Sequence, residues 1–165
     1  MAIVVVLAML LYNRLARARN RTSAAWSDVD AELRRRADLV PELNEAVAAY
    51  AVHERSVIDA AAQARNAAIS AEPDLRSGEE QRLGSAIGGV VGIAEAYPAL
   101  KASERFAQLS EQLSKSEDRI ALARLVYNDT AQTYNAAIEQ VPASLFAGAL
   151  GFRRRALFDF ADGRR

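Results

Sequence analysis

A few neighbouring residues carry the chemical groups that a catalytic or metal site would need. His53 stands beside Glu54, and an imidazole and a carboxylate are two groups that can bind a metal ion. A metal site needs several converging ligands, however, and this is the only histidine in a chain without cysteine. Glu117 and Asp118 are adjacent carboxylates, but adjacent helix residues point to different faces and make a poor acid–base pair. The residues therefore predict no metal site, no cofactor, no catalytic residue and no enzymatic activity.

Two charged residues fall in positions that a helix would bury. Arg36 and Glu54 both lie in the apolar register of a seven-residue repeat. A charge in such a seam must be paired or must face an opening to water. We expect that each residue either pairs with polar groups on another helix or marks an opening between helices.

The dipeptide Tyr-Asn occurs at 127–128 and again at 134–135, one heptad later. A buried tyrosine offers apolar bulk together with a hydroxyl group that needs a hydrogen-bond partner. We expect core packing with flanking hydrogen bonds at both places. The alternative is a ligand pocket that these residues build together with Trp26.

The elements that must position these residues are long helices, because apolar side chains recur at every seventh position in two stretches. Such a repeat keeps one stripe of a helix against a partner helix, as in a coiled coil. We therefore predict an all-α fold: an antiparallel bundle of four long helices with an N-terminal hydrophobic anchor segment. The predicted bundle core comprises Trp26, Leu33, Val40, Val47, Phe106, Leu113, Ile120, Tyr127 and Tyr134, and the repeats extend to Tyr50, Val57 and Val141.

Proline and capping residues predict where the helices begin and end. The repeat keeps its phase across Pro41, so we expect a kinked first helix that continues to about residue 66, with a sharp break as the alternative. A loop is expected over 70–78. Ser77 stands three residues before Glu80, a capping-box spacing that would start the next helix near residue 78.

The second half of the chain predicts a helix that ends before Pro98, a long helix over 103–140 and a short apolar helix over 143–150. Three glycines on the first of these helices lie four residues apart on one face, which suggests close approach of another helix. They are Gly84, Gly88 and Gly92.

The chain begins with an apolar run that is followed by clustered arginines, the pattern of a membrane helix whose following segment stays cytoplasmic. Spanning a bilayer takes roughly 20 apolar residues, and this run supplies about half of them. We favour a short anchor, or one whose beginning lies upstream; the alternatives are a helix end buried against the bundle and a signal peptide. The expected anchor residues are Ala2, Ile3, Val4, Val5, Val6, Leu7, Leu10 and Leu11, and those expected to set orientation are Arg14, Arg17, Arg19 and Arg21.

These patterns divide the chain into an anchor over 1–12, a helical bundle over 13–150 and a basic, aromatic tail over 151–165. The aromatic side chains of the tail are expected to fold back on the bundle, with contact to anionic lipid as the alternative for Arg153–Arg155. Acidic and basic residues balance at 21 each, which argues against nucleic acid as a partner.

Several blocks of the sequence, taken together and in order, resemble the LemA family. The blocks are Tyr12–Leu15, Ala25–Asp30, Leu33–Pro41, Tyr50–Glu54, Ala94–Ala102, Phe106 with Leu109, Glu117–Asn128 and Tyr134–Asn135. The resemblance implies a bacterial inner-membrane protein with one N-terminal membrane helix and a cytoplasmic helical bundle. It brings no established catalytic residue and no cofactor.

The expected function is accordingly that of a non-enzymatic, membrane-anchored scaffold or adaptor whose bundle binds envelope proteins. Its expected partners are membrane lipid and unidentified envelope proteins, and its oligomeric state stays open. The alternative is a helical binding module with a groove for a small molecule or peptide between helices, near Arg36 and Glu54.

Overall fold

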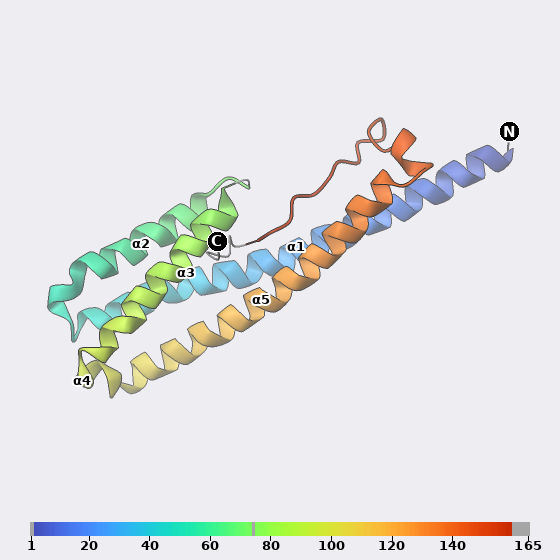
Figure 1. The fold of residues 1–165 in the computed structure, drawn as a ribbon. Helices are drawn as coiled ribbons and strands as arrows, with labels where there is room; N and C mark the ends of the chain where they lie inside the picture. The colour runs from blue at the N-terminus through green and yellow to red at the C-terminus, as the bar shows by residue number, and fades with distance from the viewer. Residues whose placement is uncertain (1, 74, 160–165) are drawn as a thin grey trace, which may run out of the picture. The chain divides into compact units, whose positions relative to one another are not determined.

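The computed structural model of the chain describes residues 2–73 and 75–159, apart from the side chains of residues 2–5 and 7. The predicted anchor side chains of Ala2, Ile3, Val4, Val5 and Leu7 thus lie outside the described residues. The described part is all α and contains no strand, as predicted (Figure 1). Its helices are α1 (Ala2–Ala48), α2 (Arg55–Ser70), α3 (Arg76–Gly92), α4 (Pro98–Lys101) and α5 (Glu104–Glu139), with short 3₁₀ helices at Val52–Glu54, Ile93–Glu95 and Ala143–Leu145.

The chain divides into two compact units. Among the described residues, unit 1 contains residues 2–30 and the segment Ala121–Phe158, while unit 2 contains the segment Ala31–Ile120 together with Asp159. Helices α1 and α5 contribute to both units, and α2, α3 and α4 belong to unit 2 alone.

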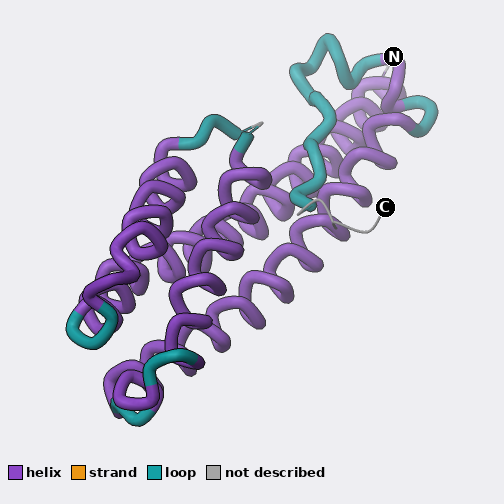
Figure 2. The backbone as a smooth tube through the Cα atoms, turned by 60° about the vertical axis from the view of Figure 1, so that its left-hand side comes forward, coloured by secondary structure: helices purple, strands orange, loops and turns teal. Residues whose placement is uncertain are grey.

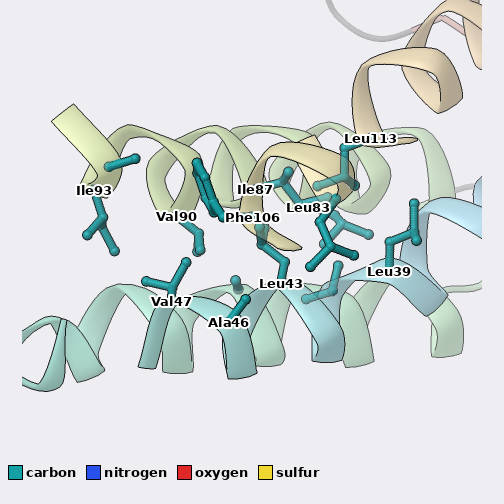
Figure 3. Close-up of a cluster of buried hydrophobic side chains, with 14 of the residues drawn as sticks. Leu39, Leu43, Ala46, Val47, Leu83, Ile87, Val90, Ile93, Phe106 and Leu113 are labelled. Carbon is teal, nitrogen blue, oxygen red and sulfur yellow. The ribbon is translucent and has the colours of Figure 1, made fainter. Parts of the chain in front are cut away.

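Unit 2 is built around one apolar core that the second half of α1 shares with α2, α3 and the beginning of α5. Figure 3 shows Leu43 and Val47 of α1 facing Leu83 and Val90 of α3, with Phe106 of α5 beside them. All five are buried. Helix α2 packs along α3 and adds small side chains such as those of Ala61 and Ala68 to this core.

Unit 1 pairs the first part of α1 with the second half of α5. Leu15 packs with Tyr134 and Ile138, and Thr22 places its hydroxyl 3.1 Å from the carbonyl oxygen of Thr130 on the other helix. After α5 the chain turns and an extended segment runs back along that helix (Figure 1, Figure 2). Phe152 and Phe158 of this segment are buried, which confirms for these two residues that the aromatic side chains of the tail fold back; Phe160 lies outside the described residues.

Helix α1 passes through Pro41, as predicted, but its predicted continuation to residue 66 is wrong. It ends at Ala48, and the chain turns through Tyr50 and the buried Ala51 into the 3₁₀ helix before α2. No proline or glycine marks this turn. The residues at the turn therefore do not mark the end of α1, and Tyr50 is exposed instead of continuing the repeat.

The predicted capping box at the start of α3 is also wrong. The helix begins at Arg76, and its N-cap residue, Leu75, makes no side-chain capping hydrogen bond. Ser77 lies inside the first turn, while the carboxylate of Glu80 bonds Arg36 of α1. A stronger tertiary partner has thus displaced the local capping interaction.

The predicted short helix over 143–150 is reduced to a 3₁₀ turn, Ala143–Leu145, followed by further turns. Val141, predicted to continue the second heptad repeat, is exposed because α5 ends at Glu139. Helix α5 otherwise matches its predicted range within one residue at each end.

The glycines of α3 do not act together as predicted. A Cβ atom on Gly84 would lie 3.3 Å from Nη1 of Arg36, whereas one on Gly88 or Gly92 would meet no atom within 4 Å. The close approach is thus confined to Gly84, and what approaches there is a buried side chain of α1.

Candidate functional site

A buried ion-pair cluster joins three helices of unit 2. Arg36 of α1 is only 1% exposed, and its Nη2 donates to the carboxylate and to the backbone carbonyl of Glu80, both at 2.8 Å. Its Nη1 donates to Oε1 of Glu117 on α5 at 2.7 Å. The prediction that Arg36 pairs with polar groups on other helices is confirmed.

The cluster is built for holding helices in position. Glu80 is buried with its arginine partner, and Arg76 places its Nε 3.8 Å from the second oxygen of the same carboxylate. Gly84 lies one turn after Glu80 and leaves room for the guanidinium group. Because both carboxylates bond the same arginine, the cluster ties α1, α3 and α5 together.

The His53–Glu54 pair does not form a ligand set. His53 is exposed, and Glu54 accepts a hydrogen bond of 3.2 Å from the hydroxyl of Tyr97. Burial of Tyr97 and this bond to Glu54 raise the pKa of the tyrosine above its ordinary value. Among the described residues no three histidine, aspartate or glutamate side chains converge to hold a metal ion.

A second polar cluster lies in unit 1, where two asparagines of α5 hold the extended tail. Asn135 donates to the carbonyl of Arg155 and accepts from its backbone N–H, both at 2.9 Å. Asn128 does the same with Phe158, at 3.1 and 2.9 Å. Each side-chain amide thus pairs with one residue of the tail as a neighbouring strand would. We call these two pairs the amide clamps.

The spacing of the amide clamps follows from helix and strand geometry. Seven residues of a helix rise about 10.5 Å, and three residues of an extended chain span about 10 Å. The clamped tail residues, Arg155 and Phe158, are three apart, and their asparagines are seven apart. The Tyr-Asn heptad repeat is therefore matched to an extended segment that lies parallel to the helix axis.

Aromatic contacts fix the tail near its clamped residues. The Phe158 ring lies 5.3 Å from Trp26, which in turn lies 5.2 Å from Tyr127, both edge to face. The Tyr127 hydroxyl donates to the carbonyl of Ala156 at 2.7 Å. Burial raises the pKa of Tyr127, although nearby Arg155 opposes the shift. The predicted flanking hydrogen bonds are confirmed, and no pattern in the amino-acid sequence had indicated that the tail backbone would be their partner.

The structure places the predicted core residues on the inner faces of their units. Leu33, Val40, Val47, Phe106, Leu113, Ile120, Tyr127 and Tyr134 are buried, and Trp26 is half-buried. Val40, Val47, Phe106 and Leu113 belong to the apolar core of unit 2, and Tyr134 belongs to the core of unit 1.

The N-terminal end of α1 leaves its described apolar side chains uncovered. Val6, Met9 and Leu10 are exposed, which contradicts a helix end buried along its whole length, and Leu11 is half-buried. Across the described part of the chain, no helix is both long enough and apolar enough to cross a bilayer. Three of the four predicted orientation arginines, Arg14, Arg17 and Arg21, line one groove of about 430 Å³, and Arg19 lies over the ring of Phe152 at 5.1 Å.

These features define an all-α protein whose interior polar groups hold helices and a tail in place. A family model described as the LemA family matches residues 25–165, and the chain belongs to that family. Protein LemA of Metamycoplasma hominis is 26% identical over 155 residues, which cover 93% of this chain and 71% of that protein.

The chain is also similar to magnetosome proteins. It is 33% identical to MamQ 2 of Paramagnetospirillum magneticum over 81 residues, which are 49% of this chain and 30% of the relative. It is 35% identical to MamQ of Magnetospirillum gryphiswaldense over 77 residues, 47% of this chain and 28% of the relative. The match thus spans less than a third of the MamQ proteins.

Proposed function

We propose that this protein is a non-enzymatic, membrane-attached scaffold of a bacterial cell envelope. The N-terminal run over 1–12 would attach it to the inner membrane, as a single-pass or peripheral protein. Residues 13–150 would form an antiparallel four-helix bundle on the cytoplasmic side, where the bundle binds other envelope proteins. Membership of the LemA family and the similarity to magnetosome proteins support this proposal.

The observation that carries the proposal is the contrast between the end of α1 and the interior of both units. Val6, Met9 and Leu10 expose their side chains, and arginines begin one turn further on. Inside the units, Arg36 and the clamp asparagines are committed to structural bonds. Attachment at one end raises the effective concentration of the bundle toward partners at the same membrane.

Cell fractionation tests the attachment. The triple variant Val6→Ser, Met9→Ser, Leu10→Ser should move the protein from the membrane fraction to the soluble fraction. The matched control is the double variant Leu122→Ser, Leu125→Ser, which removes two leucines that are equally exposed on α5 and should leave the protein with the membrane. A triple variant that stays membrane-bound would refute attachment through this segment.

Two further measurements test the rest of the proposal. A reporter fused to the C-terminus should be active only in its cytoplasmic form, and an outward-facing C-terminus would refute the orientation. Cross-linking in intact membranes, followed by purification, should recover envelope proteins with the wild type and fewer with the soluble triple variant. Equal recovery of envelope proteins with the wild type and with the triple variant would show that partner binding does not depend on membrane attachment.

The amide clamps favour a second candidate function, the binding of an extended peptide along α5. The hydrogen bonds of Asn128 and Asn135 to the tail go to its backbone N–H and carbonyl groups, so the same bonds are open to other sequences that present an aromatic residue to Trp26. A labelled peptide of residues 151–159 should bind the full chain better when Phe158→Ser loosens the resident tail. Equal anisotropy titrations for wild type and variant would exclude this candidate.

A further inference from the structure

We propose that residues 141–150 form a second membrane-contacting element, which docks with the N-terminal end of α1 on a bilayer containing anionic phospholipid. This proposal rests on the proposed membrane attachment and extends it to a segment more than a hundred residues further along the chain. We call residues 141–150 the tip, since they form the turn between α5 and the returning tail.

The tip has its small residues inside and its large apolar residues outside. Ala143 and Ala147 are buried in the core of unit 1, next to Leu15 and Phe152. The large apolar side chains of the tip are exposed, and Leu145 is 72% accessible. The exposed large apolar residues of the tip are Val141, Leu145, Phe146 and Leu150. A water-facing turn would place these residues the other way round, so the outer face is suited to an apolar environment.

The tip lies beside the N-terminal end of α1. An apolar pocket of about 480 Å³ is lined by Leu11, Tyr12 and Leu15 from the helix and by Phe146 and Leu150 from the tip, together with smaller apolar residues of both segments. Figure 1 shows the tip, drawn in orange-red, next to the blue end of α1. The tip and the helix end that carries the exposed Val6, Met9 and Leu10 thus lie at the same end of unit 1, where both expose apolar surface.

Positive charge is concentrated next to this apolar surface. Residues 2–21 and 132–157 contain one carboxylate, Glu139, which pairs with Arg154 at 3.0 Å. The same stretches contain Arg14, Arg17, Arg19, Arg21, Arg153, Arg154 and Arg155. In a chain with no net charge, this end of unit 1 is thus strongly basic. Apolar side chains bordered by arginines match an acyl layer bordered by phosphates, which identifies the partner as an anionic bilayer.

Vesicle co-sedimentation of the full chain tests the tip directly. The double variant Leu145→Ser, Phe146→Ser should bind vesicles of equal parts phosphatidylglycerol and phosphatidylcholine at least about tenfold more weakly than the wild type. The double variant Leu122→Ser, Leu125→Ser is the control, because the 68% exposed fraction of Leu125 is similar to that of Leu145. Replacing Arg14 and Arg17 by glutamine should weaken binding about fivefold per arginine, and vesicles of phosphatidylcholine alone should remove that difference.

A fluorescent label gives a second readout that does not depend on affinity. The chain has no cysteine, so Leu145→Cys and Leu125→Cys can each carry one environment-sensitive dye. Vesicles should shift the emission of the dye at 145 to the blue and should leave the dye at 125 unchanged. This measurement decides the question even if the serine variants fold poorly.

The outcomes separate this proposal from the attachment on which it rests. Normal binding by the tip variant, with loss of binding by the Val6→Ser, Met9→Ser, Leu10→Ser variant, would overturn the tip proposal and leave the attachment intact. A dye at 145 that does not respond to bound vesicles would also overturn the tip proposal. A wild type that binds neither kind of vesicle would count against both.

Discussion

Replacing Arg36 by methionine should destabilise unit 2 strongly. The guanidinium group makes three bonds of 2.7–2.8 Å, two to the buried Glu80 and one to Glu117. Methionine fills most of the volume but leaves the Glu80 carboxylate buried without its main partner, a change that costs about 3–5 kcal/mol in other proteins. Arg76, with its Nε 3.8 Å from that carboxylate, offsets part of the loss, so we expect about 3 kcal/mol.

Urea unfolding followed by circular dichroism measures this cost, and two single variants calibrate it. Arg35→Met removes a neighbouring exposed arginine and should change the unfolding free energy by less than about 0.5 kcal/mol. Glu117→Gln removes the carboxylate that is 46% exposed in the cluster and should cost only about 0.5 kcal/mol.

The double variant Arg36→Met, Glu80→Met separates the loss of an ion pair from the loss of packing. It removes both buried charges together, so its unfolding free energy should return to within about 1 kcal/mol of the wild type. An Arg36→Met variant that loses less than about 1 kcal/mol would refute the reasoning. So would a double variant as unstable as the single one, since the cost would then come from packing.

Further predictions concern the glycines of α3 and the hydrogen bonds to the tail. Gly88→Ala should raise the unfolding free energy by about 0.5–1 kcal/mol in urea titrations, because its Cβ would meet nothing within 4 Å. Gly84→Ala should raise it less, because its Cβ would lie 3.3 Å from a buried arginine nitrogen. Equal gains in unfolding free energy for the two variants would contradict the close approach at Gly84. Burial raises the pKa of Tyr127, so the unfolded chain should lose its phenolic proton first, near pH 10, and stability should fall as pH rises from there through the higher folded pKa. Unfolding titrations of Tyr127→Phe should show a smaller fall, because Tyr97, whose pKa is also raised, still contributes. An unchanged alkaline profile would contradict the assignment. Asn135→Leu should speed tryptic cleavage in the tail with little effect on global unfolding, whereas Gln132→Leu, on an exposed position nearby, should leave the cleavage rate unchanged.

The heptad repeats predicted the long helices well because burial of one stripe is a property of the sequence itself. Leu33, Val40 and Val47 are buried on α1, and the range of α5 is nearly that predicted. The end of α1 at Ala48 could not be predicted in the same way. Alanine-rich sequence continues past it, and only the packing of later helices requires the chain to turn there.

The candidate sites show a similar limit. A charge at Arg36 in an apolar register predicted a buried partner, but Glu80 had the spacing of a capping residue and its true partner lies on another helix. The repeated Tyr-Asn pairs predicted hydrogen bonds without their partners, since an extended tail has no periodic signal of its own. Residue type and register therefore indicate where a polar contact will form, and the tertiary fold determines which residue is the partner.

The tail and the tip depend on each other physically. A segment with large apolar side chains on its outside would normally collapse onto the nearest apolar surface, but Ala143, Ala147 and Phe152 already occupy those core positions. Beyond Phe152, the amide clamps bond the tail backbone, so the tip is held at α5 on one side and at the buried tail on the other. Its outer face is thus fixed before any partner binds. Loss of Asn135 should therefore weaken vesicle binding through disorder of the tip, even though that side chain lies outside the apolar surface.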